Sequence, residues 1–146
     1  MALSKGPGSP GHLLPYRHPR DRREEPLQCV DLFLAHDIEF ASLRQILEET
    51  LPAMRRLRDE GKVRFIGVTG YPLEMLRAVA EEAEIDAVLS YCHHNPLNTR
   101  LRAVLAPAAE ARGIGLVNAS PLHMGILTPA GPPPWHPAPA AVKEAG

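Results

Sequence analysis

One histidine of this sequence occupies a position typical of catalytic side chains in α/β proteins. Residues 30–35 read Val-Asp-Leu-Phe-Leu-Ala, an apolar run of strand length, and His36 and Asp37 follow at once. Such runs are typical of buried strands in a parallel sheet, and ligands bind at the carboxyl ends of these strands. The sequence therefore predicts that His36 belongs to an active site, with a buried structural histidine as the alternative.

Three further segments have the pattern of strands and end in polar or small residues. Residues 64–69 run into Gly70, residues 86–90 end at Ser90 before Tyr-Cys-His-His, and residues 115–118 run into Ala-Ser-Pro. The carboxyl ends of parallel strands meet at one edge of a sheet. We therefore expect these side chains to gather near His36.

Helical patterns separate the four expected strands. Apolar residues recur at helical spacing over residues 43–57, 73–83 and 101–108. Ser42, with a glutamine three residues later, has the pattern of a capping box, and Pro107 must lie in the first turn of its helix or kink it. Alternating strands and helices imply right-handed crossovers and a parallel sheet. A doubly wound sheet and part of an eight-stranded barrel both fit this pattern.

Other reactive residue types have weaker patterns. Cys92 precedes the adjacent pair His93 and His94, which lacks the spacing of a metal-ligand pair, so we expect no metal site. Ser120 lacks the Gly-x-Ser-x-Gly context of a hydrolase nucleophile. Cys29 and Cys92 form no disulfide framework and fit a reducing compartment.

Composition narrows the classes of partner. The 146 residues carry a formal net charge of -1, which gives no reason to expect nucleic acid or an anionic membrane surface. No apolar stretch approaches the roughly 20 residues that a bilayer span needs, and the first residues contain no apolar signal core. We expect a cytoplasmic protein with a small-molecule substrate.

The prolines divide the chain into three parts. Eleven of the 16 prolines lie in a leader and a tail. Segments of this composition bury too little apolar surface to offset the entropy lost on ordering. The sequence predicts a disordered Pro/Arg-rich leader over residues 1–27, a folded domain over 28–128 and an irregular tail over 129–146.

Three motifs, in order, resemble the aldo-keto reductase family. Residues 30–36 resemble the family's fourth barrel strand with its active-site histidine. Residues 51–69 resemble the following helix and fifth strand, for which the family pattern is L-x-x-G-K-x-R-x-I-G-V-S. Residues 120–128 (S-P-L-H-M-G-I-L-T) resemble the seventh-strand motif S-P-L-x-x-G-x-L-T. Residues 36–40, 90–93 and 131–137 look closest to the L-galactose dehydrogenase branch.

The resemblance implies an NAD- or NADP-dependent oxidoreductase that exchanges hydride with a carbonyl or sugar carbon. In this family a tyrosine moves the proton, a lysine and an aspartate tune the tyrosine's pKa, and a histidine orients the substrate oxygen. That histidine corresponds to His36. The positions that correspond to cofactor-binding residues are Thr69 and Gly70 at the nicotinamide carboxamide, Ser90 near the nicotinamide, and Ser120 and Leu122 in the loop around the pyrophosphate.

The sequence also departs from the family. The catalytic aspartate, tyrosine and lysine lie on earlier strands and have no counterpart here, and Tyr16 lacks the family's glycine and acidic neighbours. Ala119 stands where many members have an aromatic residue. The chain thus resembles four strands of a (β/α)8 barrel, whose open edges invite self-association. Two functions stay open: a weakly active or inactive reductase chain, or a non-catalytic barrel fragment that binds a partner.

Overall fold

A single parallel sheet organises the protein, whose computed structural model describes residues 29–145. The predicted disordered leader, including Tyr16, lies outside the described residues. The four strands of the described part are β1 (Val30–Ala35), β2 (Val63–Gly70), β3 (Ala87–Tyr91) and β4 (Gly115–Ala119). They pair in chain order, and every pair is parallel.

The register of the strands brings their carboxyl ends to one edge. Ala35 lies opposite Val68, and Gly70 lies opposite Ser90, which in turn lies opposite Asn118. Gly67 is required in this register, because a Cβ there would collide with the backbone carbonyl of Ala87. The last residues of all four strands therefore lie at the same edge of the sheet.

The first crossover is one long helix with a widened turn. A 3-10 turn, η2 (Ile38–Phe40), leads into α1 (Leu43–Gln45), the π-helical turn η3 (Ile46–Thr50) and α2 (Leu51–Asp59). Ser42 Oγ accepts a hydrogen bond from the Gln45 N–H at 3.1 Å, as the capping pattern predicts. The wide turn comes just before Pro52, whose ring cannot fit against the carbonyl four residues earlier in a regular helix.

The other crossovers follow the predicted helices. They are α3 (Leu73–Glu82) and a pair of short helices, α4 (Arg100–Val104) and α5 (Ala106–Arg112). Pro107 lies in the first turn of α5, and the helix axis is interrupted at Leu105. The proline thus satisfies both predicted alternatives, since it begins one helix and breaks a longer one.

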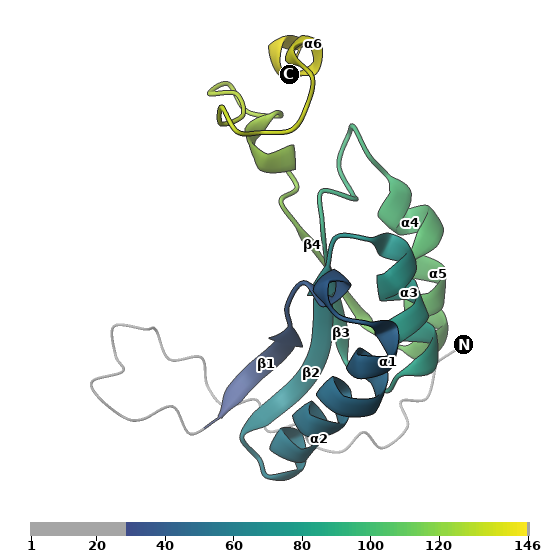
Figure 1. Ribbon diagram of the computed structural model, residues 1–146. Coiled ribbons are helices and arrows are strands. Elements are labelled where there is room, and N and C mark those ends of the chain that lie inside the picture. Colours follow the sequence, from purple (N-terminus) through teal and green to yellow (C-terminus); the bar gives the residue numbers. More distant parts are fainter. Residues whose placement is uncertain (1–28, 146) are drawn as a thin grey trace, which may run out of the picture.

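The crossover helices lie on the same side of the sheet (Figure 1). The hydrophobic core fills the space between these helices and the sheet, and Ile66, Val68, Leu76, Val79, Val88 and Leu105 are fully buried in it. A doubly wound sheet would reverse its strand order and carry helices on both faces. The arrangement is instead that of four consecutive units of a (β/α)8 barrel.

The opposite face of the sheet carries exposed apolar side chains. Period-two alternation places Leu32, Phe65 and Val117 on this open face, where they are 39%, 46% and 40% exposed. In a closed barrel this face would line the interior. The outer edges of β1 and β4 have no neighbouring strand within residues 29–145.

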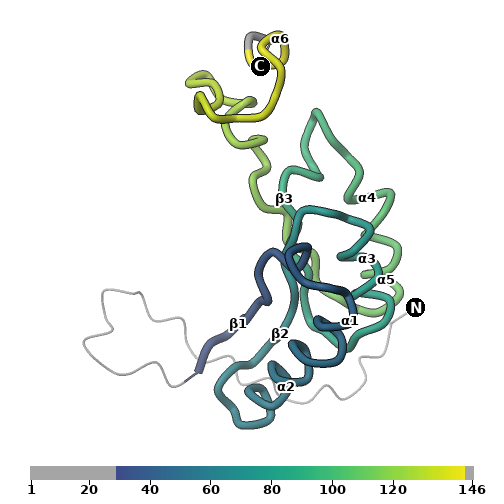
Figure 2. Tube along the Cα trace, in the orientation of Figure 1, coloured from purple at the N-terminus to yellow at the C-terminus, as the bar shows by residue number. Residues whose placement is uncertain are grey.

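The chain leaves the sheet after β4. A short turn, η4 (His123–Gly125), is followed by residues without regular structure and by the helix α6 (Ala140–Ala145), which the sequence did not predict. Figure 2 shows this segment running on from the carboxyl end of β4, away from the crossover helices. Within the described residues, no helix is long and apolar enough to cross a membrane.

Candidate active site at the carboxyl ends of the strands

Unusual backbone conformations concentrate at the carboxyl edge of the sheet. Five non-glycine residues in the described part have positive φ: Asp37 (50°), Cys92 (58°), Ser120 (51°), His123 (51°) and Met124 (52°). Each such residue costs about 1–3 kcal/mol and persists only where its surroundings enforce it. Asp37, Cys92 and Ser120 lie at the exits of β1, β3 and β4, so the strain falls where a barrel binds its ligands.

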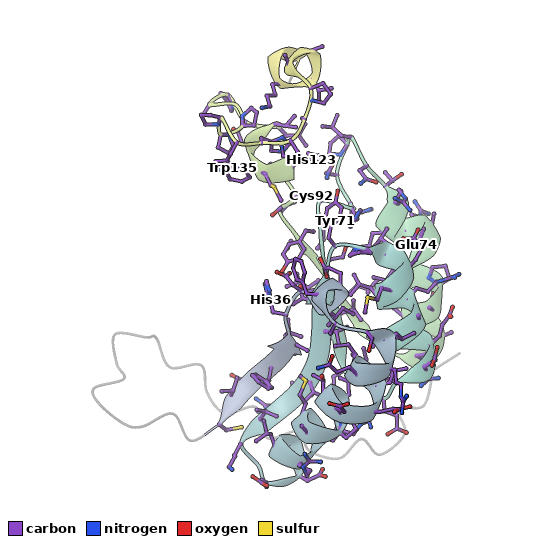
Figure 3. The ribbon with its side chains drawn as sticks, viewed as in Figure 1. His36, Tyr71, Glu74, Cys92, His123 and Trp135 are labelled. Carbon is purple, nitrogen blue, oxygen red and sulfur yellow. The ribbon has the colours of Figure 1, made fainter. Side chains whose placement is uncertain are left out.

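His36 follows directly after β1 and projects at this edge (Figure 3). Its side chain is 68% exposed, which excludes the alternative of a buried structural histidine. The Nδ1 atom lies 3.1 Å from Asp37 Oδ2, and the Nε2 atom lies 2.8 Å from the Tyr91 hydroxyl. Both ring nitrogens therefore have defined partners.

Tyr91 joins two of the predicted site residues. It is the last residue of β3, and its hydroxyl accepts a hydrogen bond from Thr69 Oγ1 at 2.9 Å while lying against His36. Thr69 is only 1% exposed and is held within β2. Tyr91 is not among the site residues predicted from the sequence, although period-two alternation along β3 places it on the same face as Leu89, the strand partner of Thr69.

Gly70 is the last residue of β2 and lies beside a carboxylate oxygen of Glu39. A Cβ at this position would lie 2.6 Å from Glu39 Oε2. Glu39 Oε1 accepts the Tyr71 N–H at 3.1 Å, whereas Oε2 is buried and has no hydrogen-bond partner within the described residues. Buried polar atoms are nearly always paired, so this oxygen is an acceptor available to an N–H group of a ligand.

Ser90 is not brought into the same cluster. It lies one residue before Tyr91, so its side chain points to the other face of the sheet. There it is fully buried, and its Oγ lies 2.8 Å from His93 Nδ1. Burial, reinforced by the Arg100 guanidinium, lowers the pKa of His93 and favours the neutral imidazole.

Cys92 connects the ends of β3 and β4. Its backbone N–H donates to the Ala119 carbonyl at 3.0 Å, and its side chain is buried. Burial raises the pKa of the Cys92 thiol, and a hydrogen bond with Ser120 opposes that shift only in part. Cys92 is therefore a neutral thiol that packs as a small apolar group.

The loop after β4 is held by its own backbone. The Ser120 carbonyl accepts the His123 N–H at 2.9 Å, and the Leu122 carbonyl accepts the N–H groups of Gly125 and Leu127. The Leu122 side chain is exposed. Ser120 and Leu122 thus lie on an ordered turn that begins at the carboxyl edge of the sheet.

Other possible sites lie elsewhere or are absent from the described part. Two surface hollows are found at the opposite end of the sheet, lined by residues such as Asp86 and Arg112, and they include none of the predicted site residues. Residues 29–145 contain no cluster of three histidine, cysteine or acidic side chains that could hold a metal ion.

Comparison with known proteins identifies the family. The sequence model of the Aldo/keto reductase family matches residues 22–139. An aldo-keto reductase from Bacillus halodurans, in its holo form, has the same fold with a TM-score of 0.61 and 18% identity, over 77% of this chain and 36% of that one. The four-stranded sheet is part of a (β/α)8 barrel, and the chain belongs to the aldo/keto reductase family.

Two curated relatives are sugar dehydrogenases. L-galactose dehydrogenase of Arabidopsis thaliana is 47% identical over 122 residues, which cover 82% of this chain and 38% of the relative. D-arabinose 1-dehydrogenase of Saccharomyces cerevisiae is 34% identical over 126 residues, covering 79% of this chain and 37% of the relative. The chain thus spans little more than a third of the length of these relatives.

The depressed pKa of His93 predicts a stability that depends on pH. In the unfolded chain His93 titrates near its ordinary value of about 6.5, so below that pH the unfolded state binds more protons than the folded state. The free energy of unfolding should therefore fall as the pH drops from about 7 to 5. Urea unfolding at several pH values measures this slope.

His93→Gln should flatten the slope, because glutamine does not titrate. His94→Gln is the matched control, since His94 is exposed, and it should leave the slope close to that of the parent protein. Equal slopes for the parent and His93→Gln would contradict the assignment of a buried neutral His93.

Proposed function

We propose that the protein is an NAD(P)-dependent oxidoreductase that acts on the anomeric carbon of an aldose, with L-galactose as the leading candidate substrate. The observation that carries the proposal is the placement of His36 at the carboxyl edge of the sheet, hydrogen-bonded to Tyr91. The names of the two sugar dehydrogenases among its relatives support the substrate class. The free cysteines fit a cytoplasmic location.

A nicotinamide cofactor fits the residues present at the strand ends. Glu39 Oε2, which lies beside Gly70 and has no partner within the described residues, can accept a hydrogen bond from a carboxamide N–H. When bound, the cofactor would exchange hydride with the sugar carbon. The proposal covers both NAD and NADP.

The chain's own residues have separate proposed roles. His36 is the catalytic residue that orients the sugar oxygen. Thr69 and Gly70 lie at the carboxamide, and the Ser120–Leu122 turn contacts the pyrophosphate. Ser90 stays a prediction as a cofactor-binding residue, since its hydroxyl is buried against His93.

Cofactor binding tests this proposal directly. Isothermal titration with NAD⁺, NADH, NADP⁺ and NADPH should give micromolar affinity for at least one pair. Ser120→Ala should weaken binding several-fold, because one neutral hydrogen bond contributes about 0.5–1.5 kcal/mol. Glu110→Ala changes an exposed side chain near the end of α5, at the opposite end of the sheet, and should leave the affinity unchanged.

No heat with any of the four nucleotides would refute the cofactor site. Reduction of NAD⁺ or NADP⁺ should then be followed across a panel of aldoses. We expect weak turnover from this chain, because within residues 29–145 the sheet has two open edges and His36 is exposed to solvent.

A second candidate function follows from the exposed open face of the sheet. We infer that this face, with the edges of β1 and β4 that have no neighbouring strand within residues 29–145, associates with a second copy of the chain. Parallel pairing of β4 in one copy with β1 in the other, made twice, would join four strands to four and close an eight-stranded barrel. Closure would cover Leu32, Phe65 and Val117 and remove both sheet edges.

The oligomeric state tests this inference. Sedimentation velocity of the full chain should give twice its mass of 16.0 kDa. Phe65→Lys places a charge on the open face and should yield monomer, because burying an unpaired ammonium is strongly unfavourable. Leu97→Lys is the matched control, since Leu97 is 53% exposed in the loop before α4, and it should remain a dimer. A monomeric parent protein, or equal behaviour of the two variants, would refute the inference.

A further inference from the structure

We propose that Asn95 and His123 form a proton-controlled latch that fixes the loop after β4 to the exit of β3, closed while the His123 imidazole is neutral and open when it is protonated. The contact joins Asn95 Nδ2 to His123 Nδ1 at 3.2 Å. His123 belongs to η4, the short turn that follows β4 (Figure 3). The latch would add a pH response to the proposed oxidoreductase, but its existence does not depend on that function.

The latch is the single hydrogen bond that joins residues 121–145 to residues 29–119 in the described part of the chain. The other hydrogen bonds of residues 121–145 lie within that segment or reach the Ser120 carbonyl. Loss of the latch would therefore leave the covalent connection at Ser120 and the packing contacts as the remaining restraints on this segment.

The orientation of the Asn95 amide is fixed by its neighbours. Its Oδ1 accepts the backbone N–H groups of Leu97 and Asn98 at 2.9 and 3.1 Å, and its Nδ2 donates to the Cys92 carbonyl at 2.9 Å. The residue is buried, with 8% of its surface exposed. Nδ2 also acts as the donor toward His123, because an amide nitrogen carries two hydrogens and has no acceptor position.

His123 Nδ1 must consequently be the acceptor of the latch. A neutral imidazole accepts at one ring nitrogen and donates at the other, so the network places the proton on Nε2. Protonation puts hydrogens on both nitrogens, and the Nδ1 hydrogen would then face those of Asn95 Nδ2. Proton uptake by His123 therefore breaks the hydrogen bond. Histidine ordinarily changes charge between about pH 5 and 8.

The titratable groups around His123 do not compensate for this loss. None of the ion pairs within residues 29–145 includes His123. The His136 ring centroid lies 6.0 Å from that of His123. Burial, Arg100 and His123 lower the pKa of His93, and Glu74 opposes them. Because Glu74 is paired with Arg100 at 2.6 Å, it does not form an ion pair with an imidazolium at position 123.

The turn that carries His123 needs an external restraint. His123 and Met124 are consecutive non-glycine residues with φ of 51° and 52°, a conformation that persists only where the surroundings enforce it. The latch supplies such a restraint, so its loss should let the loop relax. The Ser120–Leu122 turn, which we propose to contact the cofactor pyrophosphate, directly precedes His123 and would lose its fixed position.

Backbone order in the loop tests the latch without any cofactor. ¹⁵N relaxation of the full chain should give the Ile126 amide an order parameter near 0.85 at pH 8 and below about 0.6 at pH 5.5. The Leu76 amide is the internal control, because Leu76 is fully buried in the core, and it should stay near 0.85 at both pH values. Equal order of Ile126 at the two pH values would overturn the latch.

Three variants isolate the two partners. His123→Asn keeps an acceptor bonded to Cγ, does not titrate and tolerates the left-handed φ, so Ile126 should stay ordered at pH 5.5. Asn95→Asp presents a carboxylate oxygen to which an imidazolium can donate, so it should also stay ordered at pH 5.5. Asn98→Asp is the matched control in the same turn, since it retains the Oδ1 that accepts the Arg100 N–H, and it should open as the parent does.

The variants also define the results that contradict the latch. Opening of His123→Asn at pH 5.5 to the same extent as the parent would show that another group takes up the proton. An Asn95→Asp protein that is ordered at pH 8 and disordered at pH 5.5, as the parent is, would overturn the latch as well. His123→Asn decides the question if Asn95→Asp fails to fold.

The consequence for the proposed function is measured separately. Isothermal titration with NADH or NADPH should give several-fold weaker affinity at pH 5.5 than at pH 8 for the parent, and a smaller change for His123→Asn. Equal losses in the two proteins would refute an effect of the latch on the cofactor. Absence of nucleotide binding at both pH values would overturn the proposed function, whereas the order of Ile126 would still decide on the latch.

Discussion

Burial of one face of the two central strands, β2 and β3, under the crossover helices is the constraint on which the rest of the structure depends. The apolar side chains of β2 and β3 that face α2, α3 and α5, such as Ile66, Val68 and Val88, are fully buried. A shift of one residue in either strand would turn these side chains to the open face, so the packing determines the register of β2 and β3. The same register places His36, Thr69 and Tyr91 at one edge and on one face, although they lie on three different strands.

Different parts of the strands provide stability and the candidate site. The middle of the sheet and the helices carry the hydrophobic core. The strand exits instead carry left-handed non-glycine residues and a buried carboxylate oxygen that has no partner within residues 29–145, and each of these costs free energy. The exposed His36 lies at the same exits. Costs of this kind are expected where a ligand binds, and here they coincide with the end at which barrels bind substrates.

Much of this arrangement can be predicted from the sequence, because the spacing of apolar residues and the residues that begin or end a helix determine local structure. The four strands, the cap at Ser42, the break at Pro107 and the position of His36 all follow from such patterns. Tyr91 was missed since its importance depends on a hydroxyl contact with a residue 55 positions away. Ser90 lies at the predicted edge, but its side chain faces His93, and alternation along β3 was the available signal. The helix α6 lies in a proline-rich segment that gives little local indication of structure.

The central claim is that a nicotinamide ring binds beside His36 and Tyr91. The most direct test is to follow the ¹H–¹³C NMR signal of the His36 ring while the full chain is titrated with NADH and, separately, with ADP-ribose, which lacks the nicotinamide. The account predicts a shift of the His36 signal with NADH (or NADPH) and little change with ADP-ribose, because only the nicotinamide would reach this edge. Identical responses to the two ligands, or no response to NADH and NADPH, would contradict it.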